Sequence, residues 1–287
     1  MGKTSIEWAT DVWNPVTGCT KVSEGCRHCY AETMVKRFGR VGPETLPGVH
    51  PVIHDFRVML HPDRLEQPLH WRKPRRIFVN SMSDLFHKDV PEDFIDLVFG
   101  VMAAAVEHTF MVLTKRPERM LEYMTPGGEG SIELWGSRWP RGMARACFGE
   151  SEPTEFPLPN VWLGVSVEDQ ATADERIPLL LKTPAAVRFV SVEPMLGPVN
   201  LHMVPILVRG PRETALRQLD WVICGCESGP KARPMDPSWA RSLKDQCAKA
   251  GVPFFYKQAV VAGKLTKLPH IDGEQWAQFP AAAPGEE

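Results

Sequence analysis

The sequence of 287 residues lacks long apolar runs and carries little net charge. No uninterrupted apolar stretch approaches the roughly 20 residues that a membrane-spanning helix needs, and residues 1–13 contain no apolar signal segment. The formal net charge of −2 gives no general attraction to nucleic acid or to a membrane surface. We therefore expect a cytoplasmic protein with no membrane partner, in which any polyanionic partner is recognised by local patches.

A disulfide framework is not indicated either. The chain has seven cysteines, an odd number, and it is long enough to bury a substantial core without covalent cross-links. Cys19, Cys26 and Cys29 lie together in a Cys-x6-Cys-x2-Cys pattern, and no second CxxC or HxxxH pair follows to complete a four-ligand structural zinc site. Three thiolates in one loop can bind zinc or an iron–sulfur cluster and leave one position for a ligand from outside the protein.

Short apolar runs recur along the chain and predict strands. They are nearly continuous in hydrophobicity, which is typical of strands buried on both faces of a parallel sheet. These runs are 76–81, 110–114, 161–167, 187–193, 221–226 and 253–258, and the segment around Trp13 is a possible first strand.

Segments between these runs carry helical periodicity. In 91–108, Phe94, Val98, Met102 and Val106 fall on one face, and Pro91 suits a first helical turn. In 237–251, Trp239, Leu243 and Cys247 repeat the spacing, with Gly251 as a C-terminal cap. The alternation of strand and helix predicts an α/β fold, a complete or partial parallel β/α barrel of the TIM type.

The pattern favours one domain over residues 1–287. A cysteine loop is predicted at 15–32. Residues 125–160 are rich in Gly, Pro and charge and lack sustained periodicity, so we expect an irregular insertion there.

Polar residues follow each apolar run at its C-terminal end. In β/α barrels this end carries the active site, so these residues are predicted to surround one pocket, with the cysteine loop on the same face. A strand that merely reaches the surface would give the same pattern at any one position, but all of the runs behave alike. The residues at these ends are Asn80, Ser81, Met82, Ser83, Asp84, Thr114, Lys115, Arg116, Ser166, Glu168, Ser191, Glu193, Cys224, Cys226, Glu227, Ser228, Lys257 and Gln258.

Cys224 and Cys226 alternate on one predicted strand, so both should face the same side of the sheet. A thiol that faces the barrel interior near a metal centre can donate a hydrogen atom to a substrate radical. The alternative is that both side chains are small residues that fill the core.

At the level of motifs the sequence resembles the phage Gp37/Gp68-like proteins, a three-cysteine-motif family of the DUF5131 type that is related in pattern to radical S-adenosylmethionine (SAM) enzymes. The resemblance covers most of the chain. It rests on residues 4–32 with the cysteine motif, 78–94, 113–120, 161–170, 191–198 and 221–235.

The resemblance implies a radical-SAM-like β/α barrel in which Cys19, Cys26 and Cys29 hold a 4Fe-4S cluster. SAM would bind the open iron, and an external electron donor would reduce the cluster. Cys226 and Lys115 are then the candidate catalytic residues. The candidate cofactor-binding residues are Ser81, Asp84, Ser166, Glu168, Ser191, Glu193, Glu227 and Arg233.

Two features depart from the usual radical SAM pattern. The first gap of the cysteine motif has six residues in place of three, and His28 precedes the last cysteine where an aromatic residue is usual. Residues 256–264, YKQAVVAGK, also differ from the family's usual forms and can alter the substrate side of the pocket.

The substrate is less determined than the metal centre. A basic cluster at 71–76, with Arg116 and Arg119, is compatible with DNA, RNA or a nucleotide, and a solvated basic surface gives the same composition. Three interpretations remain. The chain is a radical SAM-type enzyme; or it is a nucleic-acid-binding module with zinc held by the cysteines and a water or His28; or it is an iron–sulfur redox protein that does not use SAM and depends on a partner protein.

Overall fold

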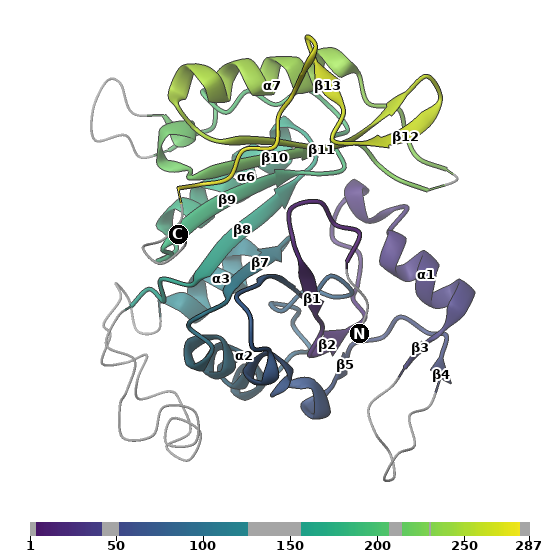
Figure 1. The fold of residues 1–287 in the computed structure, drawn as a ribbon, viewed down its shortest axis with the longest axis vertical. Coiled ribbons are helices and arrows are strands. Elements are labelled where there is room, and N and C mark those ends of the chain that lie inside the picture. The colour runs from purple at the N-terminus through teal and green to yellow at the C-terminus, as the bar shows by residue number, and fades with distance from the viewer. Residues whose placement is uncertain (1–3, 42–51, 126–155, 207–213, 230, 282–287) are drawn as a thin grey trace. The chain divides into compact units, whose positions relative to one another are not determined.

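The computed structural model describes residues 4–41, 52–125, 156–206, 214–229 and 231–281 (Figure 1). The chain divides into two compact units. Unit 1 comprises Met1–Val22, Cys29–Trp162 and Thr183–Ala186, and unit 2 comprises Ser23–His28, Leu163–Lys182 and Val187–Glu287. Most of the predicted insertion at 125–160 lies outside the described residues.

Unit 1 contains three α-helices and several short strands in its described part. Its helices are α1 (Tyr30–Phe38), α2 (Glu92–Ala104) and α3 (Pro117–Met124). Its strands are β1 (Asp11–Trp13), β2 (Val16–Thr17), β3 (Arg40–Val41), β4 (Val52–Ile53), β5 (Met59–Leu60), β6 (Arg76–Val79) and β7 (Thr109–Thr114), and its 3-10 turns are η2 (Pro62–Arg64) and η3 (Gln67–His70).

Unit 2 continues the alternation of strand and helix. Its helices are α6 (Gln170–Lys182) and α7 (Pro237–Ala250), with 3-10 turns η1 (Glu24–Cys26) and η4 (Ala215–Gln218). Its strands are most of β8 (Val161–Val167), then β9 (Val187–Val192), β10 (Trp221–Gly225), β11 (Phe254–Val261), β12 (Lys264–Lys267), β13 (His270–Ile271) and β14 (Glu274–Gln275).

The main strands are hydrogen-bonded in the order β1-β6-β7-β8-β9-β10-β11-β12. Within unit 1, β6 pairs in parallel with β1 and with β7. Within unit 2, β10 pairs in parallel with β9 and β11, whereas β12 is antiparallel to β11. This is the predicted α/β fold with a mostly parallel sheet. Because β1 and β12 end the order, the described strands form an open sheet, the partial form of the predicted barrel.

The predicted strands are present with small shifts of their ends. Each of the six apolar runs forms one strand, β6 to β11, and Trp13 ends β1. The main difference is β11, which continues to Val261 because it pairs with β12 beyond the end of β10.

The periodicity at 91–108 predicted four apolar residues on one helical face, and the structure places three of them there. Phe94, Val98 and Met102 are buried on α2, but Val106 is 72% exposed. The helix ends at Ala104 because Ala105 leaves the helical region, with φ −99° and ψ 58°. The Asn160 side-chain amide donates to the carbonyls of Met102 and Ala105 at this helix end.

The prediction for α7 holds at both ends. Asp236 caps its first turn by accepting from the Ser238 N–H at 2.8 Å, and Pro237 follows. Gly251 ends the helix in the left-handed region, with φ 74°. Leu243 and Cys247 are buried, and α7 packs on β10 and β11 (Figure 1).

The core of unit 2 is built around Trp221 on β10. Its ring lies 5.8 Å from Phe189 and 5.9 Å from Phe255 between ring centroids. Gly164 on β8 makes room for this cluster, since a Cβ there would lie 2.6 Å from the Phe189 ring. Among the described residues, no helix has the length and apolarity to cross a membrane.

Candidate functional site

The cysteine loop begins in unit 1, directly after β2. The Gly18 N–H donates to the Met82 carbonyl at 2.9 Å, and the Cys19 N–H donates to the Phe56 carbonyl at 3.0 Å. The backbone at Cys19 is therefore fixed against the segment that follows β6. Cys19 itself is half-buried and forms no disulfide.

Asp84, which follows β6, is a buried carboxylate whose two oxygens both accept hydrogen bonds from protein groups. One oxygen accepts from the Phe86 N–H and the Thr114 hydroxyl, at 3.0 and 2.8 Å. The other accepts from the Lys115 N–H and the Arg116 guanidinium, both at 3.0 Å. Asp84 thus ties the end of β6 to the end of β7 and orients Arg116.

Arg116 reaches the first cysteine of the motif. Its Nη1 lies 3.5 Å from the Cys19 Sγ, and its Nη2 donates to the Thr20 carbonyl and hydroxyl at 3.0 and 3.1 Å. Burial works against the charge on Arg116, but Asp84 and the Cys19 sulfur outweigh it and raise the pKa of the guanidinium. The permanent cation favours an anionic sulfur at Cys19.

His87 completes the surroundings of Thr20. Its Nε2 lies 2.7 Å from the Thr20 hydroxyl. Burial, and then the nearby Arg116 charge, lower the pKa of His87. The imidazole is therefore held in its neutral form beside the loop.

Cys29 forms the N-cap position of α1. Its carbonyl accepts from the Thr33 N–H and hydroxyl, at 3.0 and 2.9 Å. The next residue, Tyr30, donates its hydroxyl to the Ser81 carbonyl at 2.5 Å, and the Ser81 hydroxyl donates to the Asn14 side chain at 3.3 Å. The predicted site residue Ser81 therefore lies beside the start of α1.

The middle of the loop, residues 23–28, belongs to unit 2 and lies on Glu168. The Ser23 hydroxyl donates to Glu168 Oε1 at 3.0 Å, and the Cys26 N–H donates to the Ser23 carbonyl at 3.0 Å. Gly25 passes so close that a Cβ there would lie 2.5 Å from Glu168 Cγ. Only glycine, which has no Cβ, therefore fits at position 25 beside this carboxylate.

Glu168 is in turn paired with Arg176 on α6. The two side chains are 1% and 3% exposed and lie 3.2 Å apart, and Arg176 also donates to the Ser166 carbonyl at 2.6 Å. A buried carboxylate needs such a partner because desolvation of an isolated charge is costly. The loop around Cys26 therefore rests on a buried ion pair.

A second buried carboxylate, Glu227, holds the end of the same segment. Its Oε2 lies 3.1 Å from His28 Nδ1 and accepts from the Arg233 N–H at 2.8 Å and Nε at 2.9 Å. Arg233 also donates to the Glu24 carbonyl at 3.0 Å. Burial opposes the charge on Glu227, but the Arg233 and His28 hydrogen bonds lower its pKa to about 2.

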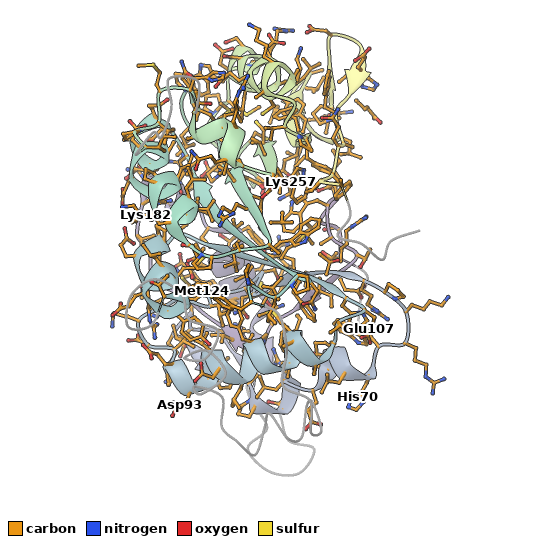
Figure 2. All side chains as sticks on the ribbon, turned by 90° about the vertical axis from the view of Figure 1, so that its left-hand side faces the viewer. His70, Asp93, Glu107, Met124, Lys182 and Lys257 are labelled. Carbon is orange, nitrogen blue, oxygen red and sulfur yellow. The ribbon has the colours of Figure 1, made fainter. Side chains whose placement is uncertain are left out.

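Glu193 organises the ends of the central strands of unit 2. Lys257, labelled in Figure 2, donates to its Oε1 at 2.6 Å, and the Gln258 amide does so at 3.2 Å. The Ser166 hydroxyl donates to the Glu193 carbonyl at 3.0 Å. Ser191 is buried two residues earlier on β9. These predicted site residues are brought together at one end of the strands.

Cys226 and Cys224 are both buried on or just after β10. Burial, and then the Glu193 charge, raise the pKa of Cys226 to about 11. Cys224 Sγ lies 3.6 Å from the Met195 sulfur. The pairing register with β11 shifts between Cys224 and Gly225, so the strict alternation on which their common orientation was predicted is interrupted.

Within each unit the predicted residues are thus brought together, and several of them serve the loop. Asp84, Glu168, Glu227 and Arg233 contact the cysteine loop or the residues that hold it. Arg176 and Gly25 were missed. Arg116 was predicted among the polar residues at the end of its apolar run and in a basic patch, but its contact with Cys19 was not predicted. In the described parts of the chain, no three His, Cys, Asp or Glu side chains form a metal-binding group.

The basic residues considered for nucleic acid have other surroundings. Arg119 donates to the carbonyls of His87 and Val90, and Arg116 faces Cys19. The cluster at 71–76 lies at the N-terminal end of β6, opposite to the end that leads to Ser81 and Asp84. Neither set supplies a basic surface at the C-terminal ends of the unit 1 strands.

A family model described as "Protein of unknown function (DUF5131)" matches residues 3–280. The chain belongs to the DUF5131 family. The resemblance seen in the motifs is therefore confirmed at the level of the family. No curated protein matches this DUF5131 chain.

Two solved structures of spore photoproduct lyase are similar to the DUF5131 chain. A mutant of that enzyme is 11% identical, with 87% of this chain and 75% of that chain covered and a TM-score of 0.43. The lyase complexed with dinucleoside spore photoproduct is 11% identical, with 82% and 71% covered and a TM-score of 0.39.

Replacing Gly25 by Ala tests the contact between the loop and Glu168. The new Cβ would overlap a carboxylate that Arg176 and Ser23 hold in place, so we expect a loss of about 1–3 kcal/mol of unfolding free energy, as for overpacked sites. Urea unfolding measures the change. Gly197→Ala is the control, because its Cβ would lie at an ordinary 3.5 Å from Asp169 Cβ. Equal stability of the two variants would contradict the packing described.

The lowered pKa of Glu227 predicts a pH dependence of stability. Because its folded pKa of about 2 lies below the ordinary glutamate pKa of 4.5, its charge stabilises the fold above pH 4.5, and this contribution is lost as the pH falls toward 2. Glu227→Gln should therefore lose less unfolding free energy between pH 6 and pH 3 than the unsubstituted protein.

The matched control for this pH series is Glu24→Gln, since exposed Glu24 contacts the same guanidinium at 3.5 Å. Glu24→Gln should follow the unsubstituted protein. If the Glu227 and Glu24 variants give the same pH profile, the assigned interaction is wrong.

Proposed function

We propose that this DUF5131 protein is a radical SAM-type enzyme that binds a 4Fe-4S cluster through Cys19, Cys26 and Cys29 and acts on DNA, RNA or a nucleotide. The observation that supports it best is the cysteine loop itself. Its three thiols are half-buried, and charged side chains on both of its flanks hold its backbone.

The donor set fits an iron–sulfur cluster. Three thiolates satisfy three irons of a four-iron cluster and leave one iron for an outside ligand. The Arg116 cation at Cys19 Sγ suits the anionic sulfur that such ligation requires. When bound, a reduced cluster together with SAM would supply a 5′-deoxyadenosyl radical.

The chain's own residues would position these groups. Ser23, Gly25 and Glu168 fix the backbone around Cys26, and His28 and Glu227 fix its end. Because the side chains of Glu168 and Glu227 are only 1% and 4% exposed and hold the loop, the candidates for SAM recognition in unit 2 are Glu193 and the neighbouring Ser166 and Ser191. The Glu193 carboxylate is 18% exposed and carries Lys257 beside it. In unit 1, Ser81 has the corresponding place after β6.

Zinc is a second candidate because of one contact. His28 Nδ1 is hydrogen-bonded to Glu227, and metal-bound histidines commonly make such a bond through the nitrogen that does not bind metal. In this alternative His28 would join the three cysteines in a closed structural site, and the chain would be a nucleic-acid-binding module.

Metal analysis distinguishes these functions. After anaerobic reconstitution we expect about four irons and four sulfides per chain, and an electron paramagnetic resonance signal of the dithionite-reduced protein that shifts when SAM is added. Replacing Cys19, Cys26 or Cys29 by Ala should abolish the signal. Cys147→Ala, outside the motif, should retain it.

Other outcomes identify the alternatives. One zinc per chain in a colourless protein would support the binding module, and a cluster whose signal ignores SAM would support the redox protein. Equal metal content in all four cysteine variants would overturn the ligand assignment.

Cys226 is the proposed hydrogen-atom donor to a substrate radical. Its raised pKa of about 11 keeps the S–H bond intact at neutral pH, and donation breaks that bond homolytically. Cys226→Ala should retain the cluster and SAM cleavage, measured as release of 5′-deoxyadenosine, but change the product or its yield. Cys224→Ala, which removes a neighbouring buried sulfur, should leave the product unchanged. An unaltered product from Cys226→Ala would make this residue part of the packing.

A further inference from the structure

The last two strands of the sheet form an arm that extends beyond their neighbours. In β11, Gln258 is the last residue that pairs with β10, opposite Gly225. From Ala259 to Val261, β11 pairs only with β12. We call residues 259–267 the arm. Figure 1 shows β12, in yellow, reaching out past the end of α7.

The turn at the tip of the arm is tight. Ala262 and Gly263 both have positive φ, 49° and 76°, which is the signature of a two-residue type I′ hairpin turn. The arm is therefore a narrow two-stranded ribbon. A ribbon of this width fits the major groove of a nucleic-acid duplex.

Apolar side chains of the arm face water. Val260, Val261 and Leu265 are 52%, 50% and 48% exposed. Val260 and Leu265 are directly opposite each other across the two strands, and Val261, the next residue, points to the other face. The exposed pair of Val260 and Leu265 near the tip of the arm indicates a surface that contacts a partner.

The charged residues around the arm are all basic. Lys257, Lys264 and Lys267 are the charged residues of 253–269, which contains no Asp or Glu. Lys264 and Lys267 are exposed. This combination of lysines and apolar side chains complements phosphates together with bases.

A protein partner that adds a strand to the free edge of β12 fits less well. The strand has only four residues, and two of them are lysines, which discourage edge-to-edge pairing.

We infer that the arm is a nucleic-acid-binding element, in which Lys264 and Lys267 contact phosphates while Val260 and Leu265 contact bases at an unstacked step. The inference rests on the nucleic-acid substrate of the proposed function and gives it a binding surface. Because the arm starts directly after Lys257 and Gln258, which contact Glu193, bound nucleic acid would lie next to the polar strand ends of unit 2.

The test uses the full chain without metal, so that it does not depend on the cluster. Fluorescence anisotropy measures binding to a 20-base-pair DNA duplex, with and without a central mismatch, over a range of salt concentration. The protein should bind both and prefer the mismatched duplex, because unstacking costs least at a mismatch.

Two kinds of variant separate the contributions. Lys264→Ala with Lys267→Ala should weaken binding to both duplexes and lower the slope of log Kd against log salt by about 2, roughly one for each lost phosphate contact. Val260→Ser with Leu265→Ser should remove the preference for the mismatch and leave the salt slope unchanged.

The controls carry the same changes elsewhere in unit 2. Lys249→Ala removes an exposed lysine from α7, and Met203→Ser removes an exposed apolar side chain; neither should alter binding. Circular dichroism and urea unfolding confirm that every variant is folded.

Each remaining outcome is decisive. Arm variants that bind like the unsubstituted protein, or a chain that binds neither duplex, would overturn the inference, as would a protein partner that competes for the arm. If the arm binds DNA but no cluster assembles, the inference stands and the enzymatic proposal fails.

Discussion

The buried ion pair between Glu168 and Arg176 is the interaction on which the arrangement of the cysteine loop most depends. A carboxylate that is 1% exposed cannot remain charged without partners, and Arg176 supplies one. Glu168 Oε1 also accepts a hydrogen bond from the Ser23 hydroxyl. The loop therefore approaches the carboxylate so closely that only glycine fits at position 25.

Two other buried carboxylates, Asp84 and Glu227, are satisfied by protein donors in the same way and hold other parts of the loop. Asp84 in unit 1 is satisfied by donors from the ends of two strands and by Arg116, which it directs to Cys19. Glu227 in unit 2 is satisfied by Arg233 and His28. Each carboxylate lies just past the end of a parallel strand and uses its charge to hold a different part of the loop. The polar strand ends are thus a support for the cysteine loop.

Much of the fold was predictable because its signals are local. Continuous apolar runs gave β6 to β11 within a few residues, and Gly251 marked the end of α7. The ends of two elements were predicted wrongly. Strand β11 continues to Val261 because β12 folds back and pairs with it, and helix α2 ends before Val106. The candidate residues were correctly placed at strand ends. Their partners were not predictable, because Arg176 and Glu168 meet across a helix and a strand.

By itself, the sequence determined the family, the alternation of strand and helix, and the three thiols that can bind a metal, since each is written in a contiguous motif or a period. Only the tertiary structure decided what the charged residues do. Whether a carboxylate faces an arginine, a loop backbone or water depends on which chain segments pack together. Such segments can be more than a hundred positions apart in the sequence, as Ser23 and Glu168 are. The arm has the same origin: Val260 and Leu265 have the sequence character of strand residues, and they are exposed because, among the described strands, only β11 and β12 pair at this end of the sheet.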